Sequence, residues 1–292
     1  MEREIEDPRK QAPKQPFPEQ GQAPPGREKD MRPRPDYGEK TYRGSGRLEG
    51  RKALVTGGDS GIGRAVALAF AREGADVAFC YLAEEEEEDA RETKRVVEEA
   101  GRQCLQVPGD VRDPAQCREM VAATLKAFGG IDILVNNAAF QMTQNSILDM
   151  PPEEIDRVFR TNVYAMFYLC QAAIPKMPPG SAIINTTSIQ AYQPKPHLLH
   201  YAASKAAIAN FTKGLSHELA ERGIRVNAVA PGPVWTPLIP STMDVESFGQ
   251  NTPLKRAAQP AEMAPIYVLL ASTESSYVTG MVYGATGGQL LV

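Results

Sequence analysis

The chain has 292 residues, of which 32 are Lys or Arg and 36 are Asp or Glu, and 42% are hydrophobic. A sizeable core is therefore available, and a net charge of −4 gives no electrostatic reason to expect nucleic acid or an anionic membrane as partner. No apolar run approaches the roughly 18 residues that span a bilayer, and the charged first residues do not resemble a secretory signal. We expect a cytoplasmic protein.

The cysteines and histidines give no sign of a metal site. The four cysteines are too scattered for a disulfide framework or a zinc site. His197, His200 and His217 have no Asp, Glu or Cys near them at a metal-ligand spacing, so the sequence predicts no catalytic metal. His197 and His200 could instead line a pocket or lie on a surface loop.

Residues 1–47 differ in composition from the remainder of the chain. They contain eight prolines and many charges of both signs, with few large apolar groups. Such a segment buries too little surface to fold alone, so it is either disordered or an extended arm. As an arm it would be anchored by Phe17, Tyr37 and Tyr42 on the domain or on a neighbouring subunit. Its loss should then affect stability or assembly before catalysis.

From Leu48 to Val292, short apolar runs alternate with amphipathic stretches of helical length. Runs that are apolar throughout are typical of a parallel sheet with both faces covered. The candidate strands are Ala53–Val55, Val77–Tyr81, Cys104–Val107, Ile131–Val135, Ala182–Asn185, Arg225–Val229 and Met281–Tyr283. The candidate helices lie near Gly63–Glu73, Glu84–Ala100, Pro114–Phe128, Glu153–Ala173, Ala202–Glu221 and Pro260–Leu270. This alternation predicts one α/β domain with a doubly wound, parallel, Rossmann-type sheet.

The first strand is followed by a glycine-rich turn, TGGDSGIG, at residues 56–63. Gly57 permits the tight turn, Gly61 lets the backbone approach a pyrophosphate, and Gly63 lets helix and strand pack closely. The spacing differs from the commonest G-x-G-x-x-G fingerprint. Its place between the first strand and the first helix nevertheless predicts a dinucleotide site.

The end of the second strand sets the specificity for the adenosine ribose, since an acid there binds the 2′-hydroxyl and an Arg binds a 2′-phosphate. Tyr81 and Leu82 provide neither group, and the glycine-rich turn offers Asp59 and Ser60 rather than a cation. The sequence therefore favours NAD(H), with NADP(H) as the alternative. Asp110, after the third strand, is placed either to contact the adenine or to lie in a surface loop.

An acidic run, Glu84–Glu88 followed by Asp89, opens the second candidate helix. Carboxylates near a helix N-terminus interact favourably with the helix dipole. We interpret the run as solvated side chains with no role in binding.

Tyr201 and Lys205 are four residues apart in a candidate helix, so their side chains lie on one helix face. A phenol with its reference pKa of about 10 is a poor base near pH 7, and lowering that pKa by some three units needs roughly 4 kcal/mol. One ammonium group about 4 Å away supplies an amount of that size. The spacing therefore predicts that Lys205 lowers the pKa of Tyr201, with an oxidised nicotinamide adding positive charge.

Further polar residues follow two strands at the carboxyl edge, where open α/β sheets bind their ligands. Ser188 comes just after the run Ala182–Asn185, and Asn137 and Ala138 follow the fourth strand. Asn162 lies in an otherwise apolar stretch of the next helix, where a polar residue is either incidental or has a dedicated partner.

Together these motifs resemble the short-chain dehydrogenase/reductase family. The glycine-rich turn, Asn-Asn-Ala at 136–138, Asn162, Ser188, Tyr-x-x-x-Lys at 201–205 and PGPVWT at 231–236 have that family's order and spacing. The match extends from Leu48 to Val292. The proline-rich extension, the GGDSGIG turn and WTPLIP at 235–240 are similar to a subgroup of glucose/ribitol dehydrogenase-like general stress oxidoreductases. Ala139 departs from the family, since many relatives have Gly there.

The resemblance implies an oxidoreductase that transfers a hydride between a nicotinamide cofactor and an alcohol or carbonyl substrate, such as a sugar, polyol, aldehyde or ketone. Tyr201 would be the general acid/base, and Lys205 would lower its pKa and hold the nicotinamide ribose. Ser188 would hydrogen-bond the substrate oxygen. Asn162 would fix a water that links Lys205 to solvent.

The resemblance also implies a set of cofactor contacts and an assembly. Besides Tyr201 and Lys205, the implied contacts are Gly57, Asp59, Ser60, Gly61, Ile62, Gly63, Tyr81, Leu82, Asp110, Val111, Asn137, Ala138, Pro231, Gly232, Val234 and Thr236. The Val234 backbone and the Thr236 hydroxyl would hold the nicotinamide carboxamide. The implied assembly is a homotetramer in which the helices carrying Asn162 and Tyr201 pair across an interface.

Two alternative functions remain open. An NADPH-dependent reductase of aldehydes or 3-oxoacyl groups is the alternative among enzymes, and a nucleotide-sensing or scaffold protein without turnover is the alternative from another class. The presence of Ser188, Tyr201 and Lys205 favours an enzyme. Enoyl reduction is disfavoured, because that branch of the family usually sets Tyr and Lys farther apart.

Substrate contacts are expected in two regions. Residues near the catalytic candidates include Phe140, Gln141, Gln190 and Tyr192. The stretch Leu238–Asn251 contains prolines and a glycine, which is typical of a mobile lid. Neither region identifies a particular substrate.

Overall fold

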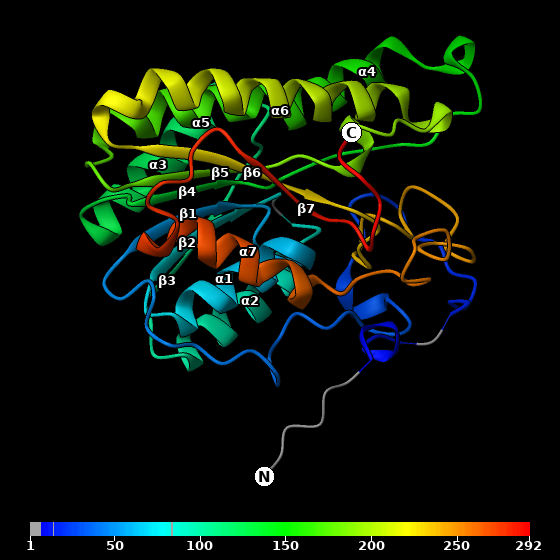
Figure 1. Cartoon of the computed structure of the whole chain (residues 1–292), viewed down its shortest axis with the longest axis horizontal. Coiled ribbons are helices and arrows are strands. Elements are labelled where there is room, and N and C mark those ends of the chain that lie inside the picture. Colours follow the sequence, from blue (N-terminus) through cyan, green and yellow to red (C-terminus); the bar gives the residue numbers. More distant parts are fainter. Residues whose placement is uncertain (1–6, 14, 83) are drawn as a thin grey trace.

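A single parallel sheet of seven strands forms the centre of the molecule (Figure 1). The computed structural model describes residues 7–13, 15–82 and 84–292. Its strands are β1 (Lys52–Thr56), β2 (Asp76–Tyr81), β3 (Cys104–Pro108), β4 (Ile133–Asn136), β5 (Ala182–Thr186), β6 (Arg225–Pro231) and β7 (Val282–Ala285). They lie in the order β3-β2-β1-β4-β5-β6-β7, so the sequence order reverses between β1 and β4. The doubly wound parallel sheet predicted from the sequence is confirmed.

Helices cover both faces of the sheet (Figure 1). One face carries α1 (Gly61–Arg72), α2 (Glu87–Glu99) and α7 (Pro260–Ala271), and the other carries α3 (Pro114–Phe128), α4 (Pro152–Phe159), α5 (Ala165–Ala173) and α6 (Leu199–Leu219). Alternate strand residues serve the two faces: Val55 packs beneath α1 and α7, whereas Leu54 packs on the other side with α5 and α6 residues. Both residues are fully buried, which explains why a central strand such as β1 has a continuous apolar run.

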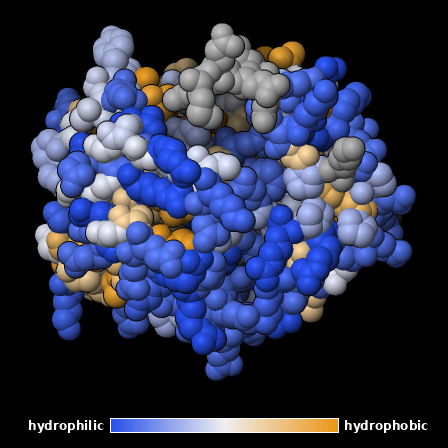
Figure 2. All heavy atoms as spheres, turned by 90° about the horizontal axis from the view of Figure 1, so that it is seen from below, coloured by the Kyte–Doolittle hydropathy of each residue, from blue (hydrophilic) through white to orange (hydrophobic). Residues whose placement is uncertain are grey.

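The outer surface of one helical layer differs from the core in hydropathy. Seen from the side of α1, α2 and α7, the surface is predominantly hydrophilic (Figure 2). Among the described residues, none of the helices is long and apolar enough to cross a membrane.

The helix expected over Glu153–Ala173 is interrupted. Its middle, Arg160–Tyr164, is a π-helical turn between α4 and α5. The side chain of Asn162 in this turn exchanges two hydrogen bonds with the backbone of Phe140, at 2.8 and 2.9 Å. A turn of this kind is frequent at functional sites, and here it holds the chain that follows β4.

The acidic run Glu84–Glu88 with Asp89 was expected to be solvated, and this expectation is wrong for Glu86 and Asp89. Helix α2 begins at Glu87, and the carboxylate of Glu86 folds back to accept a hydrogen bond from the Leu82 N–H at 2.8 Å. Asp89 is buried and pairs with Arg64 at 3.0 Å. Short-range backbone bonding and a buried cation thus withdraw these carboxylates from water.

The N-terminal arm packs against the loop that follows β6. The Phe17 ring lies 4.1 Å from the Trp235 ring, between centroids, and both side chains are buried together with Met31 and Ile239. The indole N–H of Trp235 donates to the Pro33 carbonyl at 2.8 Å. These contacts form a small separate core between the arm and its own chain.

The end of the arm is held by one carboxylate, that of Glu73 after α1. Its oxygens accept hydrogen bonds from the Tyr42 hydroxyl at 2.6 Å, the Ser45 N–H at 2.8 Å, and the backbone and guanidinium of Arg47. Burial alone would raise the pKa of Glu73, but the bonds from Arg47, Tyr42 and the amides outweigh it and lower that pKa to about 2. The ionised carboxylate is therefore the form that the fold stabilises.

Glu73→Gln should lower the free energy of unfolding by about 2–4 kcal/mol, because the buried donors around it lose a charged acceptor. Glu49→Gln, at a side chain that is 72% exposed, is the matched control and should change stability by less than about 0.5 kcal/mol. Because the folded pKa lies below the ordinary value of 4.5, the contribution is complete above that pH and is lost as pH falls toward 2. Denaturant unfolding at pH 7 and pH 3 measures both effects; equal destabilisation by the two variants at pH 7 would contradict this assignment.

Candidate active site

One cavity of about 810 Å³ lies at the carboxyl edge of the sheet, where the ends of β1 to β6 contribute to its walls. A volume of this size is typical of small-molecule and cofactor sites. Two of the predicted site residues, Gly63 and Asn162, lie outside it. The others line it: Gly57, Asp59, Ser60, Gly61, Ile62, Tyr81, Leu82, Asp110, Val111, Asn137, Ala138, Ser188, Tyr201, Lys205, Pro231, Gly232, Val234 and Thr236.

The glycine-rich turn is formed by close backbone approaches. Gly57 and Gly61 have positive φ angles of 61° and 52°, which favour glycine. A Cβ on Gly63 would lie 1.9 Å from the carbonyl oxygen of Gly57, and one on Gly61 would lie 3.0 Å from the Thr236 Cγ2. Gly63 thus lets α1 pack against the backbone of the turn. Gly61 lets the segment that contains Thr236 pack against the turn at the cavity.

Side-chain hydrogen bonds join this turn to the end of β4. The Asn137 amide donates to the carbonyl oxygens of Thr56 at 3.1 Å and Gly57 at 3.2 Å. The Thr56 hydroxyl in return accepts the N–H groups of Asn137 and Ala138, at 2.8 and 2.9 Å. Asn137 and Ala138 therefore fix the two strand ends at which the sheet reverses its order.

The end of β2 carries a carboxylate that the sequence interpretation missed. Glu86 lines the cavity beside Leu82, together with the buried Asp59. Burial, and then the charge of Asp59, raises the pKa of Glu86 to about 9, and burial raises that of Asp59 to about 6. Glu86 is four residues beyond Leu82, within reach of its N–H, but the surrounding acidic run concealed this signal.

Asp110 lines the cavity, and its carboxylate is hydrogen-bonded to Arg112. Its oxygens accept hydrogen bonds from the Arg112 N–H at 2.9 Å and from the Arg112 guanidinium at 2.5 to 2.9 Å. Burial acts to raise the pKa of Asp110, but Arg112 outweighs it and lowers that pKa. Val111, also on the cavity wall, is buried.

Tyr201 and Lys205 lie on one face of α6, as their spacing predicts, and both are buried. The Lys205 Nζ donates to the Thr186 carbonyl at 2.8 Å and lies 5.5 Å from the centre of the Tyr201 ring. Burial raises the pKa of Tyr201 to about 12, partly offset by Ser188, and lowers that of Lys205 to about 7. For the chain alone the phenol pKa is therefore raised rather than lowered as expected, because burial is the largest influence on Tyr201 and also shifts Lys205.

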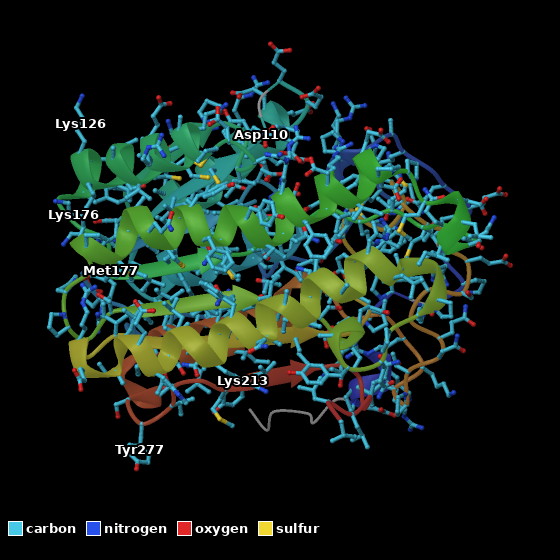
Figure 3. All side chains as sticks on the ribbon, turned by 90° about the horizontal axis from the view of Figure 1, so that it is seen from above. Asp110, Lys126, Lys176, Met177, Lys213 and Tyr277 are labelled. Atoms are coloured by element: carbon cyan, nitrogen blue, oxygen red, sulfur yellow. The ribbon has the colours of Figure 1, made fainter. Side chains whose placement is uncertain are left out.

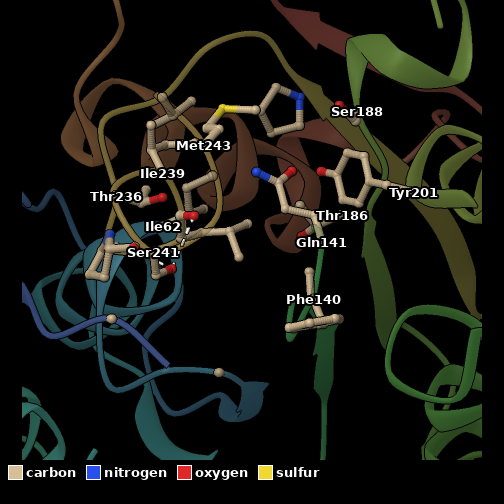
Figure 4. A pocket seen from close by; sticks show the side chains of 18 of the residues that line it. Ile62, Phe140, Gln141, Thr186, Ser188, Tyr201, Thr236, Ile239, Ser241 and Met243 are labelled. Carbon is tan, nitrogen blue, oxygen red and sulfur yellow. Dashed lines mark hydrogen bonds between the residues drawn. The ribbon is translucent and has the colours of Figure 1, made fainter. Parts of the chain in front are cut away.

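Ser188 and Asn162 lie close to this pair. The Ser188 hydroxyl accepts a hydrogen bond from the Gln190 N–H at 3.1 Å and lies beside Tyr201 at the cavity (Figure 4). The Asn162 amide also donates to the Ser204 hydroxyl at 3.0 Å. A second cavity of about 10 Å³ lies between Asn162 and Thr186, a volume close to that of one water.

The opposite wall of the large cavity comes from the segment after β6. Figure 4 shows Thr236, Ile239 and Met243 across from Tyr201, with Gln141 pointing between them. Gln141 is fixed by a 2.9 Å hydrogen bond from its amide to the Thr242 hydroxyl. Of the expected substrate contacts, Phe140, Gln141 and Gln190 line this cavity, as does His197, whereas Tyr192 does not.

The residues present fit a dinucleotide. Gly57 leaves backbone partly exposed in the turn, and α1 begins at Gly61, so the first turn of a helix lies next to the cavity. The Lys205 ammonium has one hydrogen-bond acceptor, the Thr186 carbonyl, and lines the cavity close to Tyr201. An anionic pyrophosphate and a ribose are the groups that such a site accommodates.

Comparison with protein families and curated relatives agrees with this geometry. Residues 57–289 match a family model described as enoyl-(acyl carrier protein) reductase. The uncharacterized oxidoreductase YghA of Escherichia coli is 56% identical, with 94% of this chain and 95% of the relative covered. NADPH-dependent aldehyde reductase 1 of Arabidopsis thaliana (92% and 96% covered) and glucose and ribitol dehydrogenase of Daucus carota (94% and 97%) are each 46% identical. These matches exceed the stretch from Leu48 to Val292 and so extend into the arm.

Solved structures share the fold. A short-chain dehydrogenase from Burkholderia cenocepacia, in complex with NADP, is 34% identical with a TM-score of 0.79, and 83% of this chain and 99% of that chain are covered. A short-chain dehydrogenase from Mycobacterium paratuberculosis, bound to NAD, is 32% identical with a TM-score of 0.78, with 84% and 99% covered. The two neighbours thus carry the two forms of the nicotinamide cofactor.

Proposed function

The chain belongs to the short-chain dehydrogenase/reductase family of oxidoreductases, and on this premise we propose that it interconverts alcohols and carbonyl compounds with a nicotinamide cofactor. The observation that carries this proposal is the convergence of Ser188, Tyr201 and Lys205 on the cavity that the glycine-rich turn also lines. When bound, the nicotinamide supplies or accepts the hydride. The substrate class is a sugar, polyol, aldehyde or ketone, for which the plant relatives' names give support.

Tyr201 is proposed to move the proton at the substrate oxygen. In reduction the phenol donates its proton to the developing alkoxide, and in oxidation the phenolate accepts the alcohol proton. Ser188, beside it, holds the same oxygen by a hydrogen bond. A buried phenol with a pKa of about 12 is the protonated acid at neutral pH, which suits reduction.

Lys205 and Asn162 are proposed to assist this proton transfer by connecting Tyr201 to solvent. Lys205, with a pKa of about 7, can hold or release a proton near neutral pH, and its free N–H groups suit a ribose hydroxyl. The cavity of about 10 Å³ beside Asn162 has room for one water. Such a water would link Lys205 toward solvent.

The cofactor is proposed to lie along the wall from Asp59 to Thr236. Its pyrophosphate would face the start of α1 at Ile62, and the Val234 backbone and Thr236 hydroxyl would hold the carboxamide. Around the end of β2 the described lining residues Asp59, Ser60, Tyr81, Leu82 and Glu86 include two acids and no cation. This composition supports NAD(H) over NADP(H), because these residues offer no cation to pair with a 2′-phosphate.

A second candidate is the NADPH-dependent reduction of aldehydes. The observation in its favour is the 46% identity to a relative named as an NADPH-dependent aldehyde reductase. This candidate differs from the first in its cofactor and in being limited to reduction, and it uses the same proton-transfer residues. A scaffold without turnover is the remaining alternative, and any cofactor-dependent turnover excludes it.

We also propose a homotetramer that pairs α5 and α6 of neighbouring subunits. These helices run side by side on one face (Figure 3), and large hydrophobic side chains are exposed there: Phe167 on α5 is 43% accessible, and Tyr164, in the π-helical turn just before α5, is 42% accessible. The Phe167 ring packs against that of Phe211 at 4.5 Å, so the two helices present one aromatic patch.

Tyr201→Phe should reduce turnover by at least about 10³-fold and leave cofactor affinity within about threefold, since only the acid/base is removed. Tyr277→Phe, at a fully exposed side chain that projects from the surface (Figure 3), is the matched control and should keep wild-type rates. A panel of sugars, polyols, aldehydes and ketones, followed by nicotinamide absorbance with both cofactors, gives the measurement. Near-wild-type rates in Tyr201→Phe would refute the proposed role.

Alcohol oxidation should accelerate as pH rises from 7 to 9, by close to tenfold per unit, because the phenolate fraction of a group with a pKa of about 12 grows in that proportion. Carbonyl reduction needs the protonated phenol and should show no such rise. A flat oxidation profile above pH 7 would instead mean that the phenol titrates near neutrality in the working enzyme.

Calorimetric titration at pH 7 should find NAD(H) bound at least as tightly as NADP(H), because the described residues around the end of β2 provide no cation for a 2′-phosphate. At pH 10 Glu86 is ionised, because its pKa of about 9 is exceeded, so Glu86→Gln then removes one negative charge and should favour NADP(H) relative to wild type by about three- to tenfold. Glu85→Gln, at an exposed neighbour, is the control. A tenfold preference of the wild type for NADP(H) would rule out the preference proposed here.

Light scattering should give the mass of four chains of 31.8 kDa each. Phe167→Asp should lower that mass, because it places a charge in the aromatic patch. A monomeric wild type would exclude the proposed assembly.

A further inference from the structure

The arm reaches into the site itself. We infer that the N-terminal arm completes the cofactor site, with Glu28 as a positioning residue for the glycine-rich turn and Pro24–Gly26 as part of the cavity wall. This inference rests on the proposed function, since it concerns the same cofactor. It differs from the expectation that the arm serves stability or assembly before catalysis.

Glu28 supplies the carboxylate at the start of α1. One of its oxygens accepts the Gly61 N–H at 2.8 Å, and the other accepts a guanidinium N–H of Arg64 at 2.7 Å. Ser60, the residue that precedes the helix, makes no side-chain capping bond. The orphan N–H group is therefore satisfied by a residue 33 positions away, on the arm.

The network beneath the turn extends to α2. Arg64 donates to the Asp59 carbonyl at 2.6 Å and to the Asp89 carboxylate at 3.0 Å. The Glu28 N–H donates to the other oxygen of Asp89 at 2.8 Å. Every group in this network is at least nine-tenths buried, so its charges are weakly screened and its geometry is tightly specified.

This network holds residues that border the cavity. Asp59 and Gly61 line it, and each is bonded through its backbone to Arg64 or to Glu28. A change at Glu28 therefore acts on the phosphate-binding turn through one hydrogen bond, although Glu28 does not line the cavity. That is the relation expected of a positioning residue.

Pro24, Pro25 and Gly26 form a second contact of the arm with the site, because all three line the cavity. A Cβ on Gly26 would lie 2.4 Å from the Pro237 carbonyl oxygen. Pro237 follows Thr236, whose methyl group touches the place of a Gly61 Cβ at 3.0 Å. The segment after β6 therefore packs between the arm and the glycine-rich turn. Neither contact has space for another methyl group.

The first experiment removes the carboxylate. Glu28→Ala should raise the calorimetric Kd for NAD(H) about tenfold, and Glu28→Gln, which keeps an oxygen acceptor but not the charge, about threefold. At saturating cofactor, kcat should stay within about twofold of wild type, because no group that touches the substrate is lost. Asp30→Asn, at an exposed carboxylate two residues along the same turn, is the matched control and should leave Kd unchanged.

The second experiment adds one methyl group. Gly26→Ala should raise the KM for cofactor severalfold, because it displaces Pro237 from Gly61. Gly21→Ala is its control: the nearest atom to that Cβ, the Pro240 carbonyl oxygen, would be 4.0 Å away. KM for cofactor should not change in this variant.

The outcomes separate the inference from the function on which it rests. If wild type binds cofactor and both the Glu28→Gln and Gly26→Ala variants bind it equally well, the arm has no part in the site and the inference is overturned. If the Glu28→Ala variant does not fold, the Kd of the Glu28→Gln variant for NAD(H) tests the inference instead. A wild type that binds neither NAD(H) nor NADP(H) refutes the proposed function instead.

Discussion

Helix α1 approaches strand β1 so closely that no side chain fits between Gly63 and the carbonyl oxygen of Gly57. This contact brings the start of the helix to the carboxyl edge of the sheet, next to the point where the strand order reverses. Asn137 then bonds the same carbonyl group and so connects the end of β4 to the turn. The cavity, its lining from six strand ends and the position of α6 are arranged around this fixed corner.

Much of this arrangement could be predicted because its signals are local. The seven strands are recognisable as short apolar runs, several of them apolar throughout because both faces of the central strands are covered, and the ends differ from expectation by at most two residues. The glycine-rich turn and the polar residues at strand ends follow in chain order, so their meeting at one edge is a consequence of parallel topology. Gly63 and Asn162 do not line the cavity. Gly63 packs against the backbone of Gly57, and Asn162 bonds the backbone of Phe140.

Other parts could not be predicted because they depend on contacts between distant segments. Glu86 and Glu28 look like ordinary surface acids in the sequence, and only the folded chain shows the N–H groups that they accept. The direction of the Tyr201 pKa shift could not be predicted for a related reason. Spacing places Lys205 on the same helix face but says nothing of the burial that raises one pKa and lowers the other.

Trp235 is the single tryptophan of the chain and is fully buried between Phe17 of the arm and the segment after β6. Its indole N–H is bonded to the Pro33 carbonyl, also in the arm. The tryptophan fluorescence of the protein therefore originates at this one contact between the arm and the domain. Undocking of the arm would expose the ring to water and shift its emission to longer wavelength, while melting of the sheet elsewhere could be followed separately by circular dichroism.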